Sequence, residues 1–180
     1  RELLGEHEIF AAQRVIDTEL SGAFLTDVGV VARGRVALTT PTLLRDIEAL
    51  QGFLAAQPEV VKTWSVADHV KEMNHVFGGK DPAGRYIPNS GDLIAQYLLL
   101  IQSARTPSDL PTVLDSTDHY ATIVLGTRDL GTSALRSLRR RADAFVADEL
   151  QGSPEVRFVG DYWGVSRGTR ALASGQVRVT

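Results

Sequence analysis

Residues 58–77 read "PEVVKTWSVADHVKEMNHVF", and the spacing of the apolar residues changes in the middle of this stretch. Val60, Val61 and Trp64 form a short β-branched and aromatic run, which is typical of a strand. Further along, the apolar residues recur at helical spacing: Val66, Val70, Met73 and Phe77. Ser65 and Asp68 stand in the positions of a capping pair at the start of that helix. The stretch therefore predicts a strand at 60–65 that passes directly into a helix at 66–77.

The residues upstream predict a helix and another strand. In "TTPTLLRDIEALQGFLAA" (39–56), Thr40 is a candidate N-cap and Pro41 occupies the first helical position. One face of this helix is apolar, through Leu43, Ile47, Leu50 and Leu54. Before it, "AFLTDVGVVARGRV" (23–36) predicts a strand with a bend or bulge near Gly29 or Gly34. Strand, helix and strand follow one another within about 45 residues, as in a βαβ unit.

The final third of the chain repeats this order. "HYATIVLGTRDL" (119–130) predicts a strand, "TSALRSLRRRADAFVADEL" (132–150) an amphipathic helix, and "EVRFVGDYW" (155–163) a last strand with alternating polarity. The basic cluster at 136–141 is best explained as a solvated helix face. Two βαβ halves predict an α+β fold, a ferredoxin-like sandwich with four antiparallel strands and two helices on one face.

The predicted elements divide the chain into three segments. Residues 1–22 form a lead-in, residues 23–163 form the α+β domain with a helical insertion at about 66–117, and residues 164–180 form an exit helix. The first residue is arginine, and we expect the chain to be a piece of a larger protein. No apolar run approaches the roughly 20 residues that cross a bilayer.

The segment "LIAQYLLLIQSA" (93–104) is apolar around most of its helical circumference. Such a helix is either buried at the centre of a helical subdomain or lines a cleft or interface, and the sequence leaves both possibilities open. If the helix contacts a substrate or partner, the candidate residues are Leu93, Ile94, Tyr97, Leu98 and Ile101.

Composition excludes several classes of function. The net charge is −3, from 19 Lys and Arg against 22 Asp and Glu, so the overall charge of the chain does not indicate binding to nucleic acid. Cysteine is absent, which excludes disulfides, thiolate metal sites and a cysteine nucleophile. The sequence contains no phosphate loop, dinucleotide motif or GxSxG elbow, so we assign no catalytic residue and no cofactor. His69 and His75 lie on different sides of their predicted helix, and we assign no metal ligand.

Three motifs resemble a known family. They are the helix "TPTLLRDIEALQGFL" (41–54 with its cap), the corner "VVKTWSVADHVKEMN" (60–74) and the helix entry "IPNSGDLIAQYLLL" (87–100). Together they resemble the extracytoplasmic loop of exporters in the resistance-nodulation-division superfamily, of the mycobacterial membrane protein large (MMPL) type. The likeness covers roughly residues 16–176.

The resemblance implies a proton-driven inner-membrane exporter, with this segment in the periplasm as a non-enzymatic porter domain, more in keeping with the second large loop than the first. It implies a hydrophobic or amphiphilic substrate, lipid-like or drug-like. The implied partners are the transmembrane helices and sister loop of the same chain, with a homo-oligomer and a periplasmic protein also possible. The proton-carrying acids of this family lie in transmembrane helices, so no residue of this chain inherits that role.

One alternative from another class stays open. A free-standing soluble ligand-binding or metal-dependent hydrolytic protein of ferredoxin-like fold would use His69, Glu72 and His75 around its site. The reading frame should continue into apolar helices on both sides for the exporter, whereas it should start and stop near these ends for the alternative.

Overall fold

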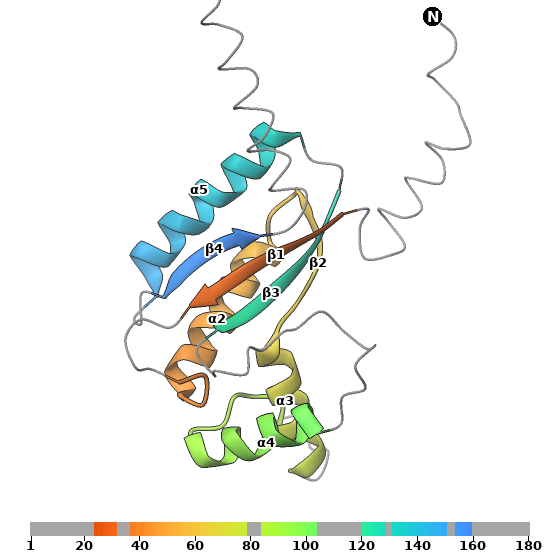
Figure 1. Ribbon diagram of the computed structural model, residues 1–180, viewed down its shortest axis with the longest axis vertical. Helices are drawn as coiled ribbons and strands as arrows, with labels where there is room; N and C mark the ends of the chain where they lie inside the picture. The colour runs from red at the N-terminus through yellow and green to blue at the C-terminus, as the bar shows by residue number, and fades with distance from the viewer. Residues whose placement is uncertain are drawn as a thin grey trace, which may run out of the picture.

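The computed structural model describes residues 24–31, 37–78, 84–103, 120–128, 131–150 and 154–159. These residues form an α+β unit with four strands and four helices (Figure 1). The strands are β1 (Phe24–Val31), β2 (Val60–Trp64), β3 (Tyr120–Thr127) and β4 (Glu155–Val159). The helices are α2 (Pro41–Ala55), α3 (Val66–Phe77), α4 (Gly91–Ser103) and α5 (Thr132–Glu149). The predicted lead-in at 1–22, the exit helix at 164–180 and the stretch 104–117 lie outside the described residues.

The four strands form one sheet in the order β2-β3-β1-β4, and every neighbouring pair is antiparallel. The register runs unbroken through Gly29, which pairs with Thr122 on one side and Arg157 on the other. A bulge at Gly29 is therefore wrong, because both neighbouring strands pair with β1 there and leave no room for an extra residue. Gly34 lies outside the described residues. The irregularity instead lies on β2, between Val60 and Lys62.

The core lies between the sheet and the apolar faces of α2 and α5. Val28 and Val30 of β1 and Val156 and Phe158 of β4 are buried against these helices. The predicted apolar face of α2 is confirmed, since Leu43, Ile47, Leu50 and Leu54 are buried. On α5, which was predicted to be amphipathic, Leu135, Leu138, Ala142 and Val146 are buried. Each leucine, isoleucine, valine or phenylalanine side chain among these residues stabilises the fold by roughly 1.5–3 kcal/mol when fully buried.

A ring contact and the hydrogen bonds of Arg141 hold α5 against α2 and the loop that follows α2. The rings of Phe53 and Phe145 stack with centroids 4.4 Å apart. In the basic cluster, Arg136 and Arg140 are exposed, as expected for a solvated face. Arg141 differs, since its guanidinium binds both carboxylate oxygens of Glu59 at 2.7 and 2.8 Å. The same guanidinium also donates to the Gln57 side chain at 2.8 Å.

Helices α3 and α4 follow β2 in the chain and pack together beyond one end of the sheet (lower part of Figure 1). Arg45 of α2 donates a hydrogen bond to Asn89, just before α4 begins. Gly91 brings the start of α4 close to the loop before α2, since a Cβ there would lie 3.1 Å from the Thr39 carbonyl oxygen. The helical pair is thus attached to the sheet domain through α2. None of the described helices is both long and apolar enough for a membrane span.

Candidate functional site

The five residues that the sequence selected on α4 lie on its packed side. Ile94, Tyr97 and Leu98 are 0%, 5% and 3% exposed and belong to the core. Leu93 and Ile101 are partly buried and pack against the same core. These positions therefore hold α4 to the rest of the domain, as the centre of a helical subdomain would.

The apolar surface that solvent reaches lies elsewhere on the helical pair. Leu99 and Leu100 of α4 are 65% and 45% exposed, and Val76 and Phe77 at the end of α3 are 45% and 62% exposed. The Phe77 ring stacks on Tyr97 with centroids 5.9 Å apart, which joins the end of α3 to α4. These four are the large apolar side chains of α3 and α4 that are most exposed in the described part of the chain.

A buried polar residue links the two helices. Asn74 donates from its side-chain nitrogen to the Gly84 carbonyl oxygen at 2.7 Å. Its amide oxygen accepts a hydrogen bond of 3.4 Å from the Tyr97 hydroxyl. Because Asn74 is only 7% exposed, both contacts are made away from water and fix how the segment before α4 sits on α3.

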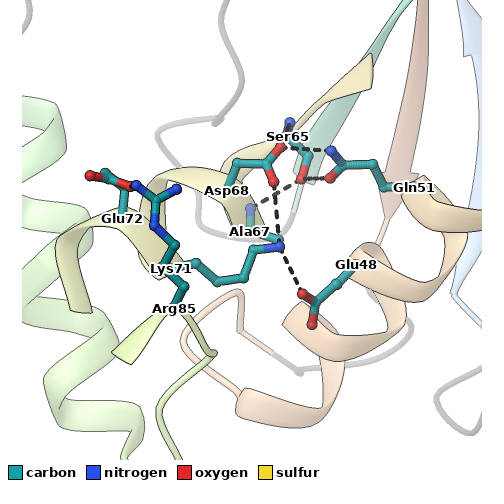
Figure 2. Close-up of polar contacts among 8 residues, drawn as sticks. All are labelled: Glu48, Gln51, Ser65, Ala67, Asp68, Lys71, Glu72 and Arg85. Atoms are coloured by element: carbon teal, nitrogen blue, oxygen red, sulfur yellow. Dashed lines mark hydrogen bonds and ion pairs between the residues drawn. The ribbon is translucent and has the colours of Figure 1, made fainter. Parts of the chain in front are cut away.

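The corner between β2 and α3 contains the predicted capping box. The Ser65 hydroxyl accepts from the Ala67 N–H, and the Asp68 carboxylate accepts from the Ser65 N–H, both at 3.1 Å. Gln51 of α2 closes the arrangement (Figure 2), because it donates to Asp68 at 2.6 Å and accepts from the Ser65 hydroxyl at 2.5 Å. The cap therefore also joins α3 to α2.

Lys71 forms ion pairs that also connect α2 and α3. Its ammonium lies 2.7 Å from a Glu48 carboxylate oxygen and 3.5 Å from Asp68 (Figure 2). Partial burial lowers the pKa of Lys71, but the hydrogen bond and charge of Glu48, with the charge of Asp68, outweigh it and leave the pKa raised. Lys71 is accordingly a fixed cation within the domain.

An open hollow of about 330 Å³ lies beside these ion pairs. Its walls are polar, and four of the five residues that line it are acidic or basic: Asp68, His69, Lys71, Glu72 and Arg85. Arg85 comes from the segment before α4, and its guanidinium lies 2.9 Å from the Glu72 carboxylate (Figure 2). Both partners are well exposed, at 61% and 49%, so this pair is far less fixed than Lys71. The hollow offers charges of both signs within reach of one small ligand.

The three residues of the alternative site are not all in the hollow. His69 and Glu72 line it, whereas its lining does not include His75. Within the described ranges, no group of three His, Cys, Asp or Glu side chains is arranged to hold a metal ion.

Comparison with protein-family models, curated proteins and solved structures gives no significant match. Arg85 was not predicted from the sequence to line a site, and the candidate residues predicted on α4 did not include Leu99 and Leu100, although both belong to its apolar segment. Arg85 carries no local signal, since the turn-rich segment around it has no hydrophobic period. Leu99 was within reach, because it follows Ile94 by five residues and so lies about 140° around the helix from it.

Proposed function

We propose that this domain is a periplasmic porter element of a proton-driven exporter, of the MMPL type in the resistance-nodulation-division superfamily. The observation that carries the proposal is the sheet order β2-β3-β1-β4 with α2 and α5 on one face. In this order the two βαβ halves interleave, as in a ferredoxin-like sandwich. The pair α3 and α4 lies between β2 and β3 in the chain, and this order supports the proposal of a helical insertion between the halves.

The surface of the helical pair supports a role in handling a hydrophobic or amphiphilic substrate. Val76, Phe77, Leu99 and Leu100 are each at least 45% exposed, and the contact of Phe77 with Tyr97 links the exposed end of α3 to α4. The domain itself performs no chemistry in this proposal. The proton-carrying acids and the membrane path belong to the transmembrane helices of the same transporter.

Transport by the native protein tests the proposal. Inverted inner-membrane vesicles that contain it receive a fluorescent lipid-like probe, N-phenyl-1-naphthylamine, in the external buffer and are energised with an acid interior. We expect probe to accumulate inside, and a protonophore to abolish the accumulation. Vesicles that accumulate no more probe than those lacking the protein, or that ignore the protonophore, would contradict proton-driven export.

A further inference from the structure

The side of α3 that lines the hollow is charged near the start of the helix and apolar near its end. Asp68, His69 and Glu72 line the charged hollow in the first two turns. Val76 follows Glu72 by four residues and therefore lies on the same side one turn further on. Val76 is 45% exposed, whereas Phe77 lies about 140° around the helix from Glu72 and stacks on Tyr97 of α4. A charged end and an apolar end thus succeed one another along a single helix.

The charges of the hollow balance, with Asp68 and Glu72 against Lys71 and Arg85. A ligand with a large net charge of either sign would meet one repulsive pair, whereas a zwitterion meets opposite charges at both of its ends. Lys71 and Asp68 are already engaged with Glu48 and Gln51 of α2. Arg85 and Glu72 are joined to each other by an exposed ion pair, and such pairs contribute little to stability. A ligand can therefore replace each partner of that pair at small cost.

The hollow also has a size that suits a head group. Its volume of about 330 Å³ lies at the lower end of the range for small-molecule pockets, roughly 300–1,000 Å³. Val76 lies one helical turn away, a distance of about 5 Å. An alkyl chain attached to a bound head group would reach this side chain along the surface of α3.

We propose that this side of α3 binds an amphiphile with a zwitterionic head group that carries a phosphate and an ammonium. The phosphate pairs with the Arg85 guanidinium, the ammonium pairs with the Glu72 carboxylate, and the alkyl chain covers Val76. The role of this site in transport rests on the proposed function. The site adds to that function the class of substrate that the domain collects.

Calorimetric titration of the chain with dodecylphosphocholine, below its micelle concentration, tests the site. We expect saturable binding that weakens at least tenfold in Arg85→Gln, in Glu72→Gln and in Val76→Ser. Phosphocholine, which lacks the chain, and dodecyl maltoside, whose head is uncharged, should each bind at least tenfold more weakly than dodecylphosphocholine. Thermal melting of each variant checks that the fold is kept.

Matched variants give the controls. Arg157→Gln removes an ion pair to Glu155 on β4 whose side chains are 63% and 48% exposed, almost the exposures of Arg85 and Glu72. Leu25→Ser removes an apolar side chain on β1 that is 54% exposed, comparable with Val76. Both controls should bind as the unchanged chain does. Absence of saturable binding, equal weakening in the controls, or equal affinity for dodecyl maltoside would overturn the site.

The outcomes separate the site from the proposed function. Proton-dependent uptake into vesicles without dodecylphosphocholine binding would overturn this site and leave the exporter standing. Binding that depends on Arg85 and Val76 without any uptake would support the site and contradict export.

Discussion

Asp27 lies in the middle of the sheet, on the face opposite to α2 and α5. Its neighbours Val28 and Thr26 point to the core side, and its partners across the strands are Val124 and Val159. Partial burial among these apolar partners removes water from the carboxylate and raises the pKa of Asp27 above its ordinary value. The folded state consequently holds the proton more tightly than the unfolded chain does.

The sign of the resulting pH dependence follows from linkage. Asp27 costs no stability below its ordinary pKa, where it is neutral in both states, and it becomes destabilising as pH rises through its raised pKa. We therefore expect Asp27→Asn to raise Tm at pH 7, and the advantage to vanish below about pH 4. Melting curves across this pH range provide the measurement. Asp148→Asn, at an exposed carboxylate of α5, controls for the loss of one charge, and an equal gain there would refute the explanation.

Ser65 is the residue at which sequence reasoning was most successful. The spacing of Ser65 and Asp68 predicted a cap, and the structure confirms the reciprocal capping box. The part played by Gln51 could not be predicted, because it depends on α2 and α3 lying side by side. Local hydrogen bonds can be read from spacing, whereas contacts between elements require the fold.

Replacement of Ser65 should destabilise the domain more than replacement of an exposed cap. Ser65→Ala loses the bond to Ala67 and the contact with Gln51, and we expect a cost of about 1–2 kcal/mol in urea unfolding. Ser90→Ala is the comparison, since the Ser90 hydroxyl accepts a longer, exposed bond of 3.3 Å from the Leu93 N–H. A cost at Ser90 equal to that at Ser65 would show that the bond to Gln51 contributes nothing.

Among the elements, α4 is the helix whose buried face could not be predicted from the sequence pattern. Strand and helix ends were predicted to within a few residues in most cases, because the apolar period and caps mark them. The buried side of α4 was not decided by the sequence, since leucine and isoleucine occur nearly all the way around it. Only its packing on α3 separates the buried Ile94 and Leu98 from the exposed Leu99.

A pair of neighbouring substitutions on α4 tests this packing. Leu98→Asp places a carboxylate at a position 3% exposed, and we expect it to cost roughly 4 kcal/mol or more and to unfold the helical pair. Leu99→Asp, at 65% exposure, should change the free energy of unfolding by less than about 0.5 kcal/mol. Circular dichroism melts of both variants measure the difference. Similar Tm values for the two proteins would contradict the assigned faces.

At the scale of the whole molecule, the described residues divide into a sheet with two covering helices and a helical pair attached through α2. Gln51, Glu48 and Arg45 of α2 make the polar contacts between these parts. The order of elements was predicted from the sequence, and the four-stranded antiparallel sheet is confirmed. The charged hollow was not predictable, because its walls come from α3 and from the segment that carries Arg85.

The proposed function requires that this domain lies outside the inner membrane as part of a larger membrane protein. An antibody raised against the 180-residue chain, applied to fractionated native cells before and after protease treatment of spheroplasts, tests it most directly. We expect a membrane-bound polypeptide several times larger than 19.5 kDa, whose epitope the external protease destroys. A polypeptide of about that mass in the soluble fraction, or a membrane-bound epitope that survives the protease, would contradict it. The soluble polypeptide would favour the free-standing ligand-binding alternative.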